Sequence, residues 1–455
     1  LQYLYGRDYP ALQTPRIHRA LEELVRAGVM TDEESAEIVE AYRFFRKLIN
    51  SLRMLRGNAE DLFLPPVDSD EFRHLARRMG YVRASGVPPS RLLNTDFQAR
   101  TAAIRRFVEH YLGRDWVPGD TSGNAADLIL SDSIRPESRS AILAEGGFRN
   151  PHRAYVNLKA LAGSDRRRKR FARLAVLAWD VLAGSPDPDM ALNNWERFTT
   201  VCGDPELHFE QLLSQPQRLE LLLKIFSSSQ FLADILIKHP DFFDWVTEPV
   251  RIKRIRGREE IAGDLSSASV ACPDTASWRA AIRRLRKREI LRIATRDICL
   301  GVPIEEIMLE LSHLAEGFIE AELERNLPSP ERSVFCVCAF GKLGGSELNY
   351  SSDLDLLGIY DPKDSDGEDL LRREERLTEA LELLRSDLSD YTDEGYVYRI
   401  DFRLRPYGSA GTLITPLPVL IEYYSRSASQ WEFQALLKAR PVAGNRRPVG
   451  RRIGR

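Results

Sequence analysis

The sequence predicts an α+β protein made mostly of helical bundles, with one further domain built on a mixed sheet. Three observations support this class. Apolar residues recur every three to four positions through most of residues 14–112 and 125–325, which is the period of amphipathic helices. Residues 334–340 form an unbroken apolar run that is typical of a buried strand. Two more strand-like runs lie between residues 353 and 405, separated by a helical segment, as a strand–helix–strand sheet requires.

Residues 1–112 are expected to form a helical bundle whose helices are marked by capping and breaking residues. The chain begins with Leu rather than Met, so we expect it to start inside a longer one. The boundary signals are Thr14-Pro15 and Gly28 around the first helix, the capping box Thr31 to Glu34 and then Gly57 around the second, Asp68 to Glu71 at the start of the third, and residues 97–112 for the fourth.

A linker and a second helical domain are expected next. Residues 113–124 contain glycine, proline and serine and are the predicted linker. Residues 125–329 are the predicted second helical domain, and its nearly apolar stretch 219–226 is expected at the centre of the bundle. The basic run 166–170 is interpreted as a solvated helix start, with contact to an acidic partner as the alternative. A second basic helix, residues 283–292, either reaches a ligand of the sheet domain or docks the helices against the sheet.

Two aspartates at the start of the second strand are the first candidate site residues. Asp353 and Asp355 are two positions apart, so alternation along a strand points both side chains to the same face. Carboxylates held so close repel each other unless a cation lies between them. Mg²⁺ prefers such oxygen ligands and leaves room for substrate phosphates. Asp353 and Asp355 therefore predict a metal site.

A glycine-rich turn precedes these aspartates. Gly344 and Gly345 allow a tight turn and a close approach of the backbone to a ligand. The turn is expected to open a helix of about two turns over residues 346–352, whose first N–H groups would face phosphate oxygens. Together with the aspartates this predicts a site for a metal–nucleoside triphosphate. The other pairs of this spacing are interpreted as caps and solvated turns, namely Asp68/Asp70, Asp187/Asp189 and Asp364/Asp366.

A third carboxylate is expected from the last strand-like run, residues 396–405. Asp401 is the candidate, although it could simply pair with a neighbouring arginine. By strand alternation Arg403 and Arg405 share its face. They could pair with Asp401 or bind phosphate oxygens through two parallel hydrogen bonds.

These motifs carry a resemblance to a known family. Gly-Lys-Leu-Gly-Gly-x-Glu-Leu-x-x-x-Ser-Asp-Leu-Asp-Leu is followed by Asp-x-Arg-Leu-Arg-Pro-x-Gly-x-x-Gly and by residues 431–444. This combination resembles the glutamine synthetase adenylyltransferase family. The resemblance implies two nucleotidyltransferase modules of the DNA polymerase β superfamily joined by helical regions. One module attaches AMP from ATP to a tyrosine of glutamine synthetase, and the other removes it by phosphorolysis.

The resemblance also assigns parts of the chain. Residues 330–445 would be the catalytic nucleotidyltransferase domain, and residues 1–112 resemble the helical tail of a preceding module. Residues 446–455 depart from the family pattern and are expected to be an irregular tail. A module preceded by the tail of another would be the second one, which in the family attaches AMP.

Roles for individual residues follow from the resemblance. The three carboxylates would hold two Mg²⁺ ions, and Asp401 would accept the tyrosyl proton. The residues expected to bind ATP are Lys342, Gly344, Gly345, Ser346, Arg403 and Arg405. Expected partners are glutamine synthetase and a PII signalling protein. One alternative is uridylylation of a PII protein, which fits residues 341–347 less well. Another is a non-catalytic helical regulator, against which three converging carboxylates argue.

Composition excludes several other classes. The net charge of −2 gives no reason to expect nucleic acid as a partner. The five cysteines have no metal-ligand spacing, and Cys336 and Cys338 fall inside a predicted buried strand, so a reduced cytoplasmic protein is expected. The seven histidines indicate neither a zinc site nor a serine–histidine triad. No signal peptide and no apolar run near 18 residues is present, so no membrane span is expected.

Overall fold

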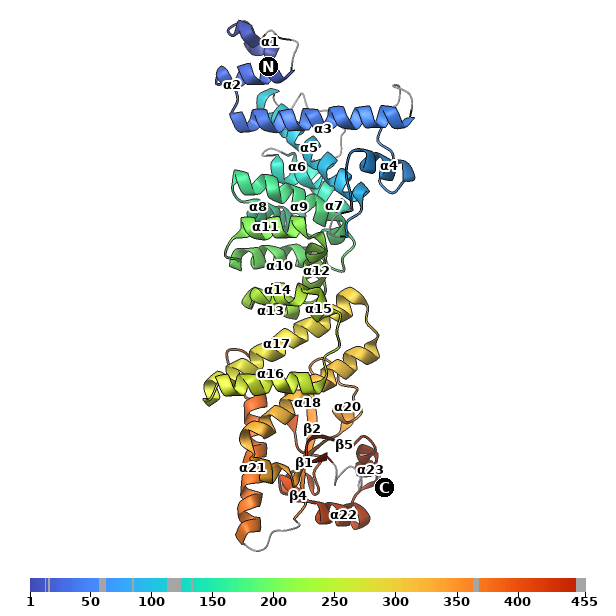
Figure 1. Cartoon of the computed structure of the whole chain (residues 1–455), viewed down its shortest axis with the longest axis vertical. Helices are drawn as coiled ribbons and strands as arrows, with labels where there is room; N and C mark the ends of the chain where they lie inside the picture. Colours follow the sequence, from blue (N-terminus) through green and yellow to red (C-terminus); the bar gives the residue numbers. More distant parts are fainter. Residues whose placement is uncertain are drawn as a thin grey trace. The chain divides into compact units, whose positions relative to one another are not determined.

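The computed structural model describes residues 1–446 except 13, 15–16, 57–62, 84–85, 113–123, 132–133 and 363–367. It divides into two compact units, Leu1–Asp241 and Phe242–Arg455. The first unit is built from helices, and the second combines helices with one mixed five-stranded sheet (Figure 1). The predicted α+β class is confirmed. The domain boundaries expected from the sequence, at 112, 124 and 329, stay predictions.

The helices of the first unit follow the expected apolar periodicity. In chain order they are α1 (Gln2–Tyr5), α2 (Ile17–Arg26), α3 (Asp32–Arg56), α4 (Asp70–Arg78), α5 (Pro89–Leu112), α6 (Ala125–Leu130), α7 (Pro136–Glu145), α8 (Pro151–Ala162), α9 (Asp165–Ala183), α10 (Pro188–Val201), α11 (Pro205–Ser214), α12 (Pro216–Ser228) and α13 (Gln230–Lys238). Helix α12 buries Leu222, Leu223 and Phe226, so its predicted central position is confirmed. Pro15, Gly57, most of the predicted linker and the tail beyond residue 446 lie outside the described residues.

Local capping explains where several of these helices begin. The Thr31 N–H donates to the Glu34 carboxylate at 2.9 Å and the Glu34 N–H donates to Thr31 Oγ1 at 3.2 Å, which confirms the predicted capping box. Asp187 accepts a hydrogen bond from the Met190 N–H at the start of α10, so this aspartate is a cap, as interpreted. The basic run 166–170 forms the first turns of α9, so the predicted helix start is correct. Its charges are not simply solvated, because Lys169 pairs with Glu37 and Arg170 with Glu206. Asp364 and Asp366 lie outside the described residues.

The second unit surrounds the sheet with helices. Its elements are α14 (Asp241–Thr247), α15 (Pro249–Ile252), α16 (Arg258–Ala271), α17 (Thr275–Leu300), α18 (Ile304–Asn326), α19 (Ser329–Arg332), β1 (Phe335–Ala339), α20 (Gly341–Gly344), β2 (Leu354–Tyr360), α21 (Glu368–Ser389), β3 (Ile400–Asp401), β4 (Ile414–Pro416), α22 (Leu417–Arg426), α23 (Gln430–Leu436) and β5 (Arg440–Gly444). The strand order is β3-β2-β1-β5, with β4 also pairing with β2. Strand β1 is antiparallel to β2 and β5, whereas β3 and β4 are parallel to β2.

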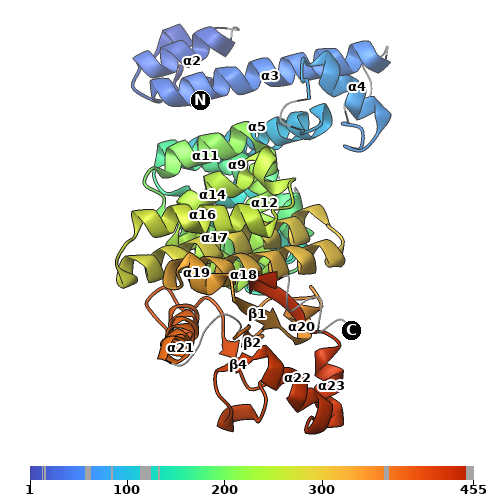
Figure 2. The same ribbon diagram turned by 60° about the horizontal axis from the view of Figure 1, so that its bottom comes forward.

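Both faces of this sheet are covered. Figures 1 and 2 show α18 and α22 on opposite sides of the strands. Cys336 and Cys338 of β1 pack in one core cluster with Leu417 and Leu420 of α22, which confirms the structural role expected for these cysteines. The strand predicted over residues 334–340 is therefore correct, and so is the helix between the two aspartate-bearing segments, which is α21.

The helix expected after the glycines is wrong in place and length. Helix α20 is a single turn that begins at Gly341, and residues 346–352 contain no helix. Ser346 and Ser351 both have a φ of 57°, in the left-handed region that an α-helix excludes. These two serines turn the chain back toward β2 instead.

The last strand is also much shorter than the expected 396–405 run. Only Ile400 and Asp401 pair with β2. The Asp401 carboxylate accepts a hydrogen bond from the Arg403 N–H at 2.8 Å, so the side chain of the aspartate directs the chain into a turn. The alternation that placed Arg405 on the same face as Asp401 therefore does not apply.

The basic helix predicted over residues 283–292 is part of α17, and it docks against the segment between α21 and β3. The buried Arg283 guanidinium donates to the carbonyl oxygens of Asp390 at 2.5 Å and Gly395 at 2.7 Å. Arg286 lies over the Tyr398 ring, 4.9 Å from its centroid. Of the two sequence interpretations, docking is the one that the contacts of this helix support.

Two adjacent glycines in the turn after β1 have different surroundings. A Cβ on Gly344 would lie 1.8 Å from the Lys438 carbonyl oxygen and 2.8 Å from that of Ala339. A Cβ on Gly345 would meet only the flexible Glu347 side chain, at 3.3 Å or more. Gly344 is therefore required by the close packing of the turn against the segment that enters β5, whereas Gly345 is not.

A buried acidic pair lies between α17, α18 and α21. Glu322 is 1% exposed and accepts a hydrogen bond from Trp278 Nε1 at 2.9 Å. Burial, together with the nearby Asp387 carboxylate, raises the pKa of Glu322 to about 8. Asp387 is itself held by Arg279 at 2.7 Å. The folded protein thus keeps a proton on this pair to a higher pH than the unfolded chain does.

We expect Gly344→Ala to destabilise the second unit by about 1–3 kcal/mol, because the backbone of the β5 segment must move away. Gly345→Ala should change its stability by no more than about 1 kcal/mol in either direction. Urea unfolding of both variants and the unchanged protein, followed by circular dichroism, measures the difference. Equal effects at the two positions would contradict the packing explanation.

We also expect the stability of the second unit to fall as the pH rises from about 6 to 8. A folded-state pKa raised above the unfolded value gives a contribution that is complete below the unfolded pKa and lost as the pH passes the folded pKa. The slope is at most about 1.4 kcal/mol per pH unit for one proton. Glu322→Gln should flatten this dependence in urea unfolding at several pH values. Glu324→Gln, an exposed change of equal charge on the same helix, should not; if it does, the acidic pair is not the source.

Candidate active site

The three predicted carboxylates come from two neighbouring strands. Asp353 directly precedes β2, Asp355 is the second residue of β2, and Asp401 is the last residue of β3. The parallel register pairs Asp355 with Asp401. Strand pairing therefore brings together carboxylates that are 46 residues apart in the sequence.

Their electrostatics show that the three groups interact. Burial raises the pKa of Asp355, and the negative charges of Asp401 and Asp353 raise it further. Arg403 and Lys342 act in the opposite direction. The Arg403 guanidinium, hydrogen-bonded to Asp401, holds the pKa of that carboxyl below its usual range. The charged form of Asp355 is thus destabilised by its neighbours, whereas the charged form of Asp401 is stabilised by Arg403.

Two arginines bind Asp353 and Asp401. The Asp353 carboxylate accepts a hydrogen bond from Arg399 Nε at 2.5 Å. Arg403 contacts Asp401 through its backbone N–H, through Nε at 2.8 Å and through Nη2 at 2.5 Å. The pairing expected between Asp401 and Arg403 is present. Sequence reasoning missed Arg399, although the parallel register, with Ile400 opposite Leu354, would have placed it beside Asp353.

Arg405 has a different environment. Its guanidinium donates to the carbonyl oxygens of Phe402 at 2.9 Å, Ser409 at 3.1 Å and Gly411 at 2.9 Å. These bonds close the turn that follows β3. The predicted role of Arg405 in binding ATP stays a prediction.

The glycine turn lies against Asp355. A Cβ on Gly341 would be 3.0 Å from Asp355 Oδ2, and its φ of 57° also favours glycine. The N–H groups of Gly344, Gly345 and Ser346 donate to carbonyl oxygens within the turn at 3.0–3.1 Å. These donors are satisfied in this conformation, so their predicted use for phosphate stays a prediction.

An ion pair between the partly buried Arg440 and the buried Glu316 braces the turn from outside, and sequence reasoning missed it. Arg440 of β5 donates to the carbonyl oxygens of Leu343 and Gly344, each at 2.9 Å, and pairs with Glu316 of α18 at 2.5 Å. Further along the loop, the Leu348 N–H donates to Ser312 Oγ of the same helix at 3.2 Å. Helix α18 thus fixes the segment that leads to Asp353.

The fit of this site to a metal ion is partial. The donors are carboxylate oxygens, which suit Mg²⁺. Within the ranges that the structure describes, however, no group of three or more His, Cys, Asp or Glu side chains is arranged to hold a metal. Asp353 and Asp401 are turned onto arginines instead. The donor chemistry agrees with the prediction, and metal binding itself stays a prediction.

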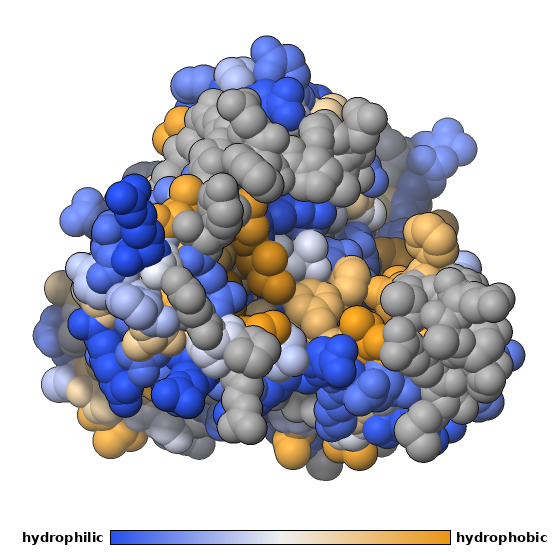
Figure 3. Space-filling view, turned by 90° about the horizontal axis from the view of Figure 1, so that it is seen from above, coloured by the Kyte–Doolittle hydropathy of each residue, from blue (hydrophilic) through white to orange (hydrophobic). Residues whose placement is uncertain are grey.

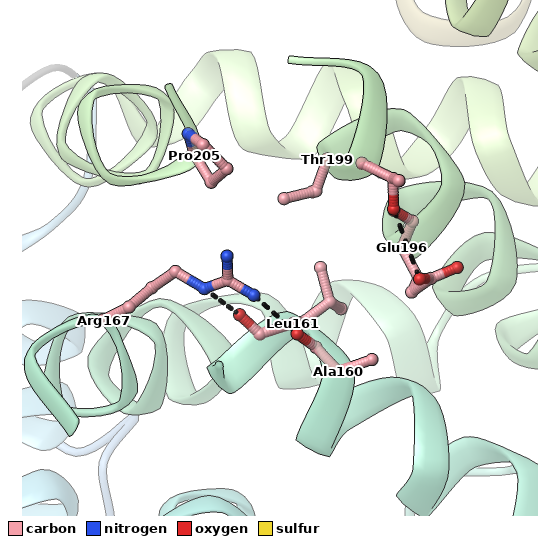
Figure 4. A pocket seen from close by; sticks show the side chains of 7 residues that line it. Ala160, Leu161, Arg167, Glu196, Thr199 and Pro205 are labelled. Atoms are coloured by element: carbon pink, nitrogen blue, oxygen red, sulfur yellow. Dashed lines mark hydrogen bonds between the residues drawn. The ribbon is translucent and has the colours of Figure 1, made fainter. Parts of the chain in front are cut away.

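A cavity elsewhere contains none of the predicted site residues. It lies in the first unit and has a volume of about 310 Å³. Figure 4 shows Arg167 at its edge, donating to the carbonyl oxygens of Leu161 at 2.9 Å and Ala160 at 2.6 Å. Both hydrogen bonds tie Arg167 to the end of α8. This arginine of the basic run 166–170 thus has a structural role.

In Figure 3 apolar residues gather in a hollow, and hydrophilic residues lie toward the outer part of the view. Among the described helices, none combines the length and the apolar character that a membrane span requires.

Comparison with known proteins gives matches over nearly the whole chain. A family model described as glutamate-ammonia ligase adenylyltransferase matches residues 219–452, and one described as PII-uridylyltransferase matches residues 9–112. Proteins from Thioalkalivibrio sulfidiphilus, Xanthomonas axonopodis pv. citri and Mycobacterium tuberculosis are 28%, 30% and 26% identical, over 97%, 98% and 98% of this chain. Each is named bifunctional glutamine synthetase adenylyltransferase/adenylyl-removing enzyme.

These relatives are longer proteins. The matches cover 48%, 48% and 45% of the three relatives, so the chain spans about half of their length. The adenylyltransferase model itself covers slightly more than half of this chain and includes all three carboxylates, the glycine turn and the Arg440 brace. The chain belongs to the glutamate-ammonia ligase adenylyltransferase family.

Proposed function

We propose that the second unit is a nucleotidyltransferase that transfers AMP from ATP to a tyrosine of glutamine synthetase. One observation carries the proposal: the parallel register of β2 and β3 brings Asp355 and Asp401 together beside a glycine turn. The same residues lie within the match to the adenylyltransferase family. Residues 330–445 are accordingly the proposed catalytic domain, preceded by the helical domain 125–329.

The proposed roles follow from the charges of the site. Asp353, Asp355 and Asp401 would hold Mg²⁺, which when bound would neutralise charge on the transferring phosphoryl group. Asp401 would accept the proton of the tyrosyl hydroxyl. Its bond to Arg403 lowers its pKa and hence its basicity, so loosening of that bond would make it a better base. Lys342 and Arg403, whose positive charges act on Asp355, would bind the triphosphate of ATP.

Attachment of AMP is the proposed direction, rather than its removal. Residues 9–112 match a model of a second nucleotidyltransferase family, which supports their origin in the helical tail of a preceding module. A module in that position would be the attaching one. The uridylyltransferase match ends at residue 112 and includes none of the three carboxylates, so uridylylation has less support. A PII signalling protein as a further partner and a cytoplasmic location are part of the same proposal.

We expect the chain to label glutamine synthetase when it is incubated with labelled ATP and Mg²⁺, and Asp355→Asn to lower the rate at least about 100-fold. Asp187→Asn, which alters a helix cap that asparagine fills equally well, is the matched control and should keep the activity. A parallel incubation contains adenylylated synthetase and phosphate.

The outcomes separate the candidate functions. Labelled synthetase supports attachment. ADP release from the adenylylated synthetase alone would make this the removing module. If both incubations are inactive with a protein that is folded by circular dichroism, the non-catalytic regulator replaces the proposed enzyme.

A further inference from the structure

The arginines that bind Asp353 and Asp401 are exposed. The side chain of Arg399, bonded to Asp353, is 60% exposed, and that of Arg403, bonded to Asp401, is 82% exposed. The Asp401 side chain is only 21% exposed. The Asp353 side chain is itself 51% exposed. Both guanidiniums thus lie on the solvent side of the site, the side from which an ion would arrive, and Arg403 covers more of its carboxylate than Arg399 does.

We propose that Arg399 and Arg403 are displaceable counter-ions, which occupy Asp353 and Asp401 until a divalent cation takes their place. This inference rests on the proposed function, since it concerns the same three carboxylates. It also accounts for the partial fit described above. The donor set suits a hard cation, but two of its three members face arginines until that cation binds.

Other arginines of the second unit form more bonds than Arg399 does, and their partners include backbone carbonyls. Arg440 binds two backbone carbonyls and the buried Glu316, and Arg405 binds three backbone carbonyls. In the described part of the chain, the Arg399 guanidinium has Asp353 as its bonded partner. Exposed ion pairs of this kind are weak and are easily exchanged, whereas buried ones are not.

Asp355 provides the reason for the exchange. It is paired with Asp401 in the parallel register and stands two residues after Asp353, so the three negative charges meet at one edge of the sheet. A divalent cation placed against Asp355 would face all three carboxylates with two charges, whereas Arg399 is bonded to Asp353 and Arg403 to Asp401, each with a single charge. Its binding would draw Asp353 and Asp401 away from their guanidiniums.

The displaced arginines would then be available at the rim of the site. A guanidinium offers planar pairs of donors that match phosphate oxygens. Metal entry and the release of two phosphate-binding side chains would thus be one event. Lys342 differs, because its charge acts on Asp355 although no described hydrogen bond or ion pair joins it to the three carboxylates.

The test is direct binding of Mn²⁺, which shares the oxygen ligands of Mg²⁺ and is visible by electron paramagnetic resonance. It uses the full chain without nucleotide. We expect Arg399→Gln and Arg403→Gln each to lower the Kd for Mn²⁺ about two- to five-fold, the range for loss of an exposed ion pair. Lys342→Gln removes a charge that acts on Asp355 without a described bond to any of the three carboxylates, and it should change the Kd less than either arginine variant. Asp355→Asn should abolish the site.

Each outcome has a distinct meaning. Tighter binding in both arginine variants than in Lys342→Gln supports displacement. An equal decrease of the Kd in Arg399→Gln, Arg403→Gln and Lys342→Gln would mean that only the net positive charge near the site matters, and would overturn the displacement proposal. An unchanged or higher Kd in the two arginine variants would also overturn the displacement proposal. The proposed function would still stand if Mn²⁺ binding is lost in Asp355→Asn. The absence of saturable Mn²⁺ binding in every variant would overturn the inference together with the metal site on which it rests.

Discussion

Repulsion between three carboxylates at one edge of the sheet is the constraint on which the second unit depends. The parallel pairing of β2 and β3 sets Asp355 opposite Asp401, with Asp353 two residues before Asp355. Such a juxtaposition is unfavourable unless cations offset it. The sheet can hold this register because β1, packed between β2 and β5, is buried along its whole length.

The helices of the second unit supply the fixed framework for this edge. Helix α17 binds the segment that enters β3, and α18 binds the loop that enters β2 through Ser312. Arg292 of α17 is in turn bonded to both Glu289 and Glu310, with 1% of its own side chain exposed. A buried charge of this kind costs little only when every partner is present, so these contacts impose one arrangement on the helices that hold the site.

Patterns that depend on neighbouring residues were predictable, and contacts across the sheet were not. The apolar run of β1, the helix α21 and the cap at Thr31 followed from local periodicity and capping chemistry. The length of β3 did not, because the Asp401 side chain competes with strand pairing for the Arg403 N–H. The Arg440 brace could not be foreseen, since the pairing of β5 with β1 joins segments about 100 residues apart.

Burial divides the arginines of this unit into two kinds. Arg283 and Arg292 are almost fully buried, and loss of a partner there would leave a charge without water or counter-ion, at a cost of about 3–5 kcal/mol. Arg399 and Arg403 are mostly exposed, where an ion pair contributes about 0.2–1 kcal/mol and water can replace the partner. The buried arginines therefore fix the helices, whereas the exposed arginines at the carboxylates remain exchangeable. The proposed uptake and release of charged ligands at the carboxylates requires this difference, because partners bound as tightly as those of Arg292 would exclude a ligand.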